Sequence, residues 1–174
     1  MSIKKILTEP DSFLRQKSKR VEKVSDSIRL LMDDMLETMY GAPGIGLAAI
    51  QIGVPKRVIV MDIPNDNDKK NPLYFVNPEI ISSSKNAATY EEGCLSVPGQ
   101  FAEINRPDKC HIKYLDYFGV SQELKAEGLL ATCIQHEMDH LEGILFIDYL
   151  SKLKKTMIVK KLTKQKKEIE RIVV

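Results

Sequence analysis

The sequence predicts an α+β fold in which the strands pair mainly antiparallel. Apolar residues recur at helical spacing near both ends of the chain, whereas the middle consists of short strand-like segments separated by turn residues. Helices at the ends with strands between them are typical of α+β proteins. The length of 174 residues suits one domain with a hydrophobic core, so we expect residues 1–174 to form a single domain.

Three helices are expected from the periodicity. The first begins at Ser25 or Asp26, either of which can serve as N-cap, and ends at the glycines and proline of 41–44. The second covers about 129–141, and the third runs over about 151–170. One face of the first helix carries apolar side chains at spacings of three and four: Ile28, Leu31, Met32, Met35 and Met39.

The expected strands are short. Residues 57–62 (RVIVMD) indicate a buried strand, and 109–117 with 120–126 indicate a hairpin around a Phe118-Gly119 turn. We expect Asn77-Pro78 to split another strand region into two pieces. The remaining strand-like segments are 73–76, 79–83, 90–96 and 101–104.

Composition and charge exclude several classes of protein. Hydrophobic residues make up 43% and charged residues 29%, and the net charge of +2 is too small to indicate nucleic-acid binding. We find no secretory signal and no apolar run approaching the ~18–20 residues that a membrane span needs. Three cysteines cannot all pair within one chain, so we expect reduced thiols and a cytoplasmic location. We expect neither a membrane partner nor specific DNA binding.

The run His136-Glu137-Met138-Asp139-His140 fits the pattern H-E-x-x-H. Four residues are nearly one helical turn, so both imidazoles project from the same face toward one point. Glu137 follows the first histidine and can stand beside a metal ion without binding it, within reach of a metal-bound water. The motif therefore predicts a metal site with a neighbouring general acid/base.

Two histidines do not complete a catalytic metal site, which usually has three protein ligands and one open position. No histidine follows His140, and Asp148 cannot be dismissed from spacing alone. Upstream, Cys94 lies in a tight glycine-containing segment between strand-like pieces and can present a thiolate. The residues leave three further alternatives: Cys133, which fits a wall of the site better than a ligand, Cys110 as a small buried thiol, and His111 as an exposed imidazole.

The segment from Gly44 to Ala49 formally fits the dinucleotide fingerprint G-x-G-x-x-A. That fingerprint requires a preceding strand and a following helix, whereas here a helix is expected before the segment and a strand after it. The small residues are better interpreted as allowing a peptide backbone to approach closely.

Three separated segments resemble the signature motifs of peptide deformylases: GIGLAAIQ at 44–51, EGCLS at 92–96 and QHEMDHLEG at 135–143. The resemblance implies antiparallel sheets packed around a central helix that carries the HEMDH motif, with a C-terminal helix. It also implies a single catalytic domain that removes the N-formyl group from the N-terminal methionine of newly synthesised polypeptides and releases formate.

Matched position by position, the resemblance assigns the metal ligands to Cys94, His136 and His140 and the acid/base role to Glu137. Ligand type alone favours Zn²⁺, but the resemblance implies Fe²⁺, one ion per chain, for which Zn²⁺, Ni²⁺ or Co²⁺ can substitute. Two other functions remain open at this point. One is a zinc endopeptidase, which shares H-E-x-x-H, and the other is a non-catalytic binding module with the same fold.

The resemblance also assigns substrate contacts. Gln51 and the backbone N–H of Leu95 become oxyanion donors, and the backbone of Gly46 pairs with the substrate strand. Many relatives have an arginine where Phe101 stands here, which places polar contacts downstream of methionine in doubt. Expected wall residues of the methionine pocket are Ile45, Leu129, Thr132 and Cys133.

From Ser151 onward the chain has eight lysines and one arginine against two glutamates. A solvated helix face accounts for this charge on its own. The resemblance adds another interpretation, since a basic C-terminal helix can dock on the ribosome. The side chains that would meet rRNA phosphate are Lys152, Lys154, Lys155, Lys160 and Lys161.

Overall fold

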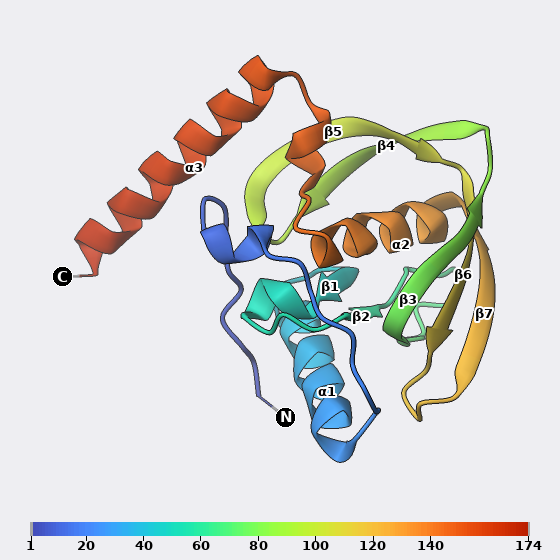
Figure 1. The fold of residues 1–174 in the computed structure, drawn as a ribbon. Helices are drawn as coiled ribbons and strands as arrows, with labels where there is room; N and C mark the ends of the chain where they lie inside the picture. Colours follow the sequence, from blue (N-terminus) through green and yellow to red (C-terminus); the bar gives the residue numbers. More distant parts are fainter. Residues whose placement is uncertain (1, 174) are drawn as a thin grey trace.

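In the computed structural model, which describes residues 2–173, helix α2 (Gly128–Leu141) lies between two antiparallel sheets (Figure 1). The five-stranded sheet contains, in spatial order, β1 (Gly46–Ala48), β2 (Val58–Met61), β3 (Leu73–Ser83), β6 (Lys109–Leu115) and β7 (Ser121–Glu127). The two-stranded sheet contains β4 (Ala87–Cys94) and β5 (Val97–Pro107). The predicted α+β fold with antiparallel pairing is therefore confirmed.

Among the residues that the structure describes, two further helices, α1 (Asp26–Gly41) and α3 (Lys152–Ile172), and three 3₁₀ turns complete the fold. Ser25 occupies the N-cap of α1, and the buried face of this helix includes the predicted Ile28, Met32, Met35 and Met39. In Figure 1, the C-terminal end of α3 points away from the two sheets. Within residues 2–173, no helix has both the length and the apolar content needed to cross a bilayer. The 3₁₀ turns are η1 (Ser12–Arg15), η2 (Ala49–Ile52) and η3 (Phe146–Tyr149).

Three apolar clusters hold these elements together. One apolar cluster joins α2 to the five-stranded sheet, with Ala131, Ile134 and Leu141 on the helix and Ile59, Phe75 and Ile112 on the strands. A second cluster packs α1 on the outer face of β2. The third holds β5, η3 and the first turns of α3 together through Val97, Ile104, Phe146, Ile147 and Leu162.

The predicted break at Asn77-Pro78 is wrong, because β3 runs through it as one strand. The ladder with β6 instead shifts register between Val76 and Glu79, and Asn77 adopts a positive φ of 51°. The side chain of Asn77 accepts from the N–H of Val21 and donates to its carbonyl oxygen, both at 2.8 Å. These bonds satisfy neighbouring backbone groups, so a bulge is tolerated without ending the strand.

Other strand boundaries also differ from expectation. β1 lies inside the glycine-containing segment and was not predicted, because three residues show no alternation. β5 extends well beyond 101–104 at both ends, since it pairs with β4 along nearly its whole length. β4 begins at Ala87 and ends at Cys94, two residues before the predicted end.

Candidate metal centre and active site

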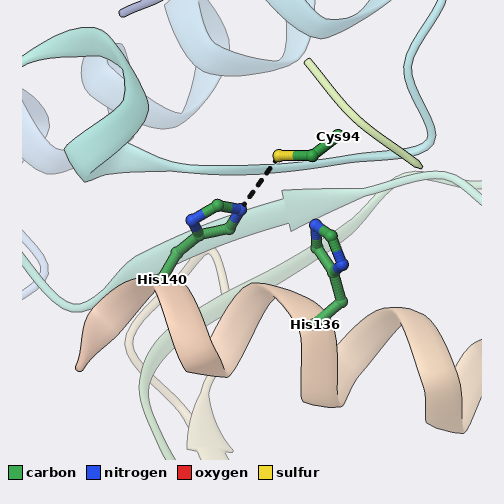
Figure 2. A group of neighbouring side chains, drawn as sticks. All are labelled: Cys94, His136 and His140. Atoms are coloured by element: carbon green, nitrogen blue, oxygen red, sulfur yellow. Dashed lines mark hydrogen bonds between the residues drawn. The ribbon is translucent and has the colours of Figure 1, made fainter. Parts of the chain in front are cut away.

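Helix α2 presents both motif histidines to one point. The ring centroids of His136 and His140 lie 5.1 Å apart, and the residues are 8% and 1% exposed. Figure 2 shows both imidazoles leaving α2 toward the same side. The local geometry predicted from H-E-x-x-H is thus present in the fold.

Cys94 approaches the two histidines from the opposite side, at the end of β4 (Figure 2). Its Sγ lies 3.3 Å from His140 Nε2, and the donor atoms of Cys94, His136 and His140 all lie within 4.8 Å of one another. One thiolate and two imidazoles suit a divalent transition metal, and three protein donors are the usual number at a catalytic site. Cys94, His136 and His140, hereafter the metal-binding cluster, therefore fit a metal ion.

The alternative third ligands lie elsewhere. Asp148 is held by Arg15 Nη1 and Lys155 Nζ, each at 2.6 Å. Cys110 is buried in the core, and His111 Nε2 pairs with Glu123 at 2.8 Å. Cys133 lines the neighbouring cavity without joining the cluster, in the wall position expected for it.

The second ring nitrogen of His136 has a carboxylate partner. Glu92 Oε1 lies 2.8 Å from His136 Nδ1, and both oxygens of Glu92 accept from Arg106, at 2.7 Å from Nε and 3.0 Å from Nη2. Burial alone would raise the pKa of Glu92, but its hydrogen bonds to His136 and Arg106 outweigh this and lower it. Because the ionised carboxylate can only accept, Nδ1 donates, which leaves Nε2 free for a metal.

The contacts of Glu92 with His136 and Arg106 were not predicted from the sequence. Glu92 is the first residue of the EGCLS segment, but nothing in the local pattern indicated its partner. Arg106 lies 14 positions away on β5, and its burial became apparent only from the fold.

Glu137 lies beside the metal-binding cluster and is buried. It is 4% exposed, and its Oε2 has no hydrogen-bond partner within the described residues. Burial raises the pKa of Glu137 to about 7. A carboxyl group with a pKa near neutrality can both take and return a proton, which is what a general acid/base requires.

Gln51 is fixed next to Cys94. Its Oε1 accepts from the N–H of Ala48 at 2.8 Å, which aims Nε2 at Ser96 Oγ (3.0 Å) and Cys94 Sγ (3.6 Å). The residue is 1% exposed. Leu95, between Cys94 and Ser96, lines the same cavity. Gln51 and Leu95 therefore both border the cavity beside Cys94, and their role as oxyanion donors stays a prediction.

A cavity of about 480 Å³ opens beside these groups. Its lining includes Cys94 and the buried His136 and Glu137, together with Phe101, which is 66% exposed. The wall contains every residue expected for a methionine pocket: Ile45, Leu129, Thr132 and Cys133.

Gly46 shows why a small residue is needed in this wall. A Cβ at Gly46 would lie 2.5 Å from Glu137 Oε1 and 3.0 Å from Cys133 Sγ. Helix α1 precedes the glycine segment and antiparallel strands follow it, so the dinucleotide interpretation is excluded.

Comparison with known proteins decides the family. The polypeptide deformylase family matches residues 3–156. The chain belongs to the polypeptide deformylase family. Among curated relatives, the peptide deformylase of Pelagibacter ubique is 72% identical over 166 residues, covering 95% of this chain and 96% of that protein. The peptide deformylase of Phenylobacterium zucineum is 60% identical over 167 residues, covering 96% and 99%.

Solved deformylase structures have the same fold. The peptide deformylase of Legionella pneumophila superposes with a TM-score of 0.90 at 49% identity, covering 98% of this chain and 99% of that one. The peptide deformylase of Ehrlichia chaffeensis gives a TM-score of 0.92 at 45% identity, covering 96% and 98%. As a deformylase, the protein is a metal-dependent hydrolase that removes the N-formyl group from the methionine of nascent peptides. The endopeptidase and binding-module alternatives are not supported.

Proposed function

We propose that Cys94, His136 and His140 hold the catalytic metal ion of this deformylase and that Glu137 is its general acid/base. The observation that carries the proposal is the convergence of three donor atoms within 4.8 Å of one another beside a buried carboxyl group. We further propose that Gln51 Nε2 and the N–H of Leu95 stabilise the oxyanion.

We assign a residue to each step of hydrolysis. When bound, a divalent metal supplies Lewis-acid chemistry, polarising the formyl carbonyl and lowering the pKa of water from ~15.7 toward ~7. Glu137 takes the proton of the attacking water on Oε2 and returns it to the leaving amide nitrogen, which must be protonated to depart. Gln51 and Leu95 donate to the oxygen that gains charge, and removing one such donor typically costs ~2.7–4 kcal/mol.

The composition of the cavity wall supports a methionine pocket. Ile45, Leu129, Thr132 and Cys133 form a mainly apolar surface next to the metal-binding cluster, which suits an unbranched thioether side chain. β1 is an edge strand of its sheet, so one side of Gly46 remains open to pair with a substrate backbone. In this proposal the formyl group lies at the metal-binding cluster and the methionine side chain fills the pocket.

We propose Fe²⁺ as the physiological metal, with Zn²⁺, Ni²⁺ or Co²⁺ able to substitute, and a cytoplasmic location. A thiolate with two imidazoles accepts each of these ions, so availability and reactivity decide between them. Metal analysis of protein purified without air measures the choice. A majority of Zn²⁺ together with full activity would contradict the iron assignment.

We also propose that residues 1–174 form one catalytic domain whose basic helix α3 docks on the ribosome. Lys152, Lys154, Lys160 and Lys161 are exposed, whereas Lys155 pairs with Asp148. Because α3 also packs against the body, charge reversal tests this better than truncation. Changing the four exposed lysines to glutamate should weaken ribosome binding most strongly at low salt, and unchanged binding would refute the idea.

Two substitutions test the site assignment. Cys94→Ser should weaken metal binding severely and remove activity, because an alcohol is a poor substitute for a thiolate donor. Glu137→Gln should retain one metal ion per chain and lower kcat by about 100-fold or more. Metal content and formate release are measured on both. Normal turnover by the glutamine variant would refute the acid/base role.

A further inference from the structure

The support of His136 continues past Arg106 to the surface of the molecule. Asp139 Oδ2 accepts from Arg106 Nη1 at 2.8 Å and from the hydroxyl of Tyr149 at 2.8 Å. Arg106 in turn holds Glu92, which accepts from His136. A continuous row of hydrogen bonds therefore joins Tyr149, which is 52% exposed, to an imidazole at the metal-binding cluster.

The donors of Arg106 are divided so that its two partners do not compete. Nε and Nη2 point at the two oxygens of Glu92, and Nη1 points at Asp139. A guanidinium is planar and rigid, so holding Nη1 also fixes the direction of the other two donors. The side chains of Arg106 and Glu92 are each only 5% exposed, which leaves little water to replace a lost partner.

Tyr149 contacts this network in two ways. Its hydroxyl donates to Asp139, and its ring centroid lies 5.0 Å from Arg106 Cζ, within the range of a cation–π contact. It is the last residue of η3, whose first residue, Phe146, stacks on His136 with centroids 6.2 Å apart and planes inclined at 27°. The same short turn thus touches His136 on its ring face and supports it at Nδ1.

We propose that Tyr149 is a positioning residue for the metal centre. It holds Asp139 and Arg106 in place and, through Glu92, sets the tautomer and ring orientation of His136. The inference rests on the proposed role of His136 as a metal ligand. Partners of this kind typically change metal affinity or activity by about 10–100-fold when removed. Because Tyr149 acts through three intervening side chains, its own effect is expected at or below the lower end of that range.

The test compares Tyr149→Phe with Tyr117→Phe in the full-length protein loaded with Co²⁺. Tyr117 is a matched control, because its hydroxyl also donates to a carboxylate, Asp33 Oδ2 at 3.1 Å. Within the described part of the chain, this hydroxyl has no hydrogen bond to Glu92, Arg106 or Asp139. Two quantities are measured: the rate at which a chelator removes Co²⁺, and the visible absorption spectrum of the bound ion. Circular dichroism confirms that each variant is folded.

We expect Tyr149→Phe to lose Co²⁺ about 3–10-fold faster and to shift the visible spectrum, and Tyr117→Phe to match the wild type. Asp139→Asn, which keeps the size of the side chain, should have the larger effect. Equal rates and spectra for the two tyrosine variants would overturn the inference, even if both lowered the melting temperature. A wild type that showed no cobalt–thiolate absorption would refute the metal-ligand assignment itself.

Discussion

Replacing Gly46 by alanine should disable Glu137 without substituting any charged residue. The new Cβ would lie 2.5 Å from Glu137 Oε1, whereas ordinary contact begins at 3.4 Å, so the carboxylate or β1 has to move by about 0.9 Å. β1 is held by its ladder to β2. We therefore expect Glu137 to give way, and it cannot do so without leaving its place beside the metal-binding cluster.

The expected loss follows from that distance. A misplacement of about 1 Å at a reacting group can cost about 100-fold in rate, which corresponds to ~2.7 kcal/mol of activation free energy. Most of the loss should appear in kcat, because Glu137 acts in the transition state rather than in substrate binding. The positive-φ strain that penalises alanine at other glycines does not arise at Gly46.

The assay is formate release from a formyl-methionyl peptide, with metal content and melting temperature measured on the same preparation. Gly41→Ala is the matched control, since its nearest neighbour, Ile3 Cδ1, would lie at an ordinary 3.5 Å. The control should retain activity. A folded, metal-loaded Gly46→Ala protein with kcat within about two-fold of wild type would refute the steric argument.

Three more outcomes are expected from the structure. Partial burial alone would raise the pKa of Asp148, but hydrogen bonds and ion pairs outweigh it and lower the pKa below the ordinary 3.8. The ionised carboxylate therefore stabilises the folded state fully above pH 3.8. This stabilisation is lost as the pH falls through the lower pKa of the folded state. Asp148→Asn should therefore lower the free energy of unfolding by about 1 kcal/mol at pH 7 and much less in acid, as urea titrations at several pH values would show. Leu162→Ala should cost about 2 kcal/mol because Leu162 is 3% exposed, whereas Leu153→Ala, at 71% exposed, should be nearly neutral in the same titration. Removing a metal ion that is present at 100 times its Kd should lower the free energy of unfolding by about 2.7 kcal/mol. If a chelator left the melting temperature unchanged, the metal would not be bound by the folded state alone.

Local patterns determined which parts of the fold were predictable. The three long helices follow from spacing and caps, and the two histidines share a face because four residues make nearly one turn. The β3 bulge was missed because its cause, the amide of Asn77 on the backbone of Val21, lies 56 residues away in sequence. Without that contact, the pair Asn77-Pro78 predicts the end of a strand.

Local sequence patterns predicted even less of the metal-binding cluster and its supporting residues. From the residues alone Cys94 remained one of several candidate ligands, because only the placement of β4 against α2 brings it to the histidines. The family resemblance selected Cys94, and the geometry brings it to the predicted place. The network of Glu92, Arg106 and Asp139 was not foreseen, since no spacing rule links β4, β5 and α2.

Formate release from a formyl-Met tripeptide by anaerobically purified, Fe²⁺-loaded protein tests the activity and its assigned site together. We expect rapid formate release with no cleavage of the internal peptide bonds, and loss of this release in Glu137→Gln at unchanged metal content. Absence of formate from folded protein carrying one metal ion per chain would contradict the assignment.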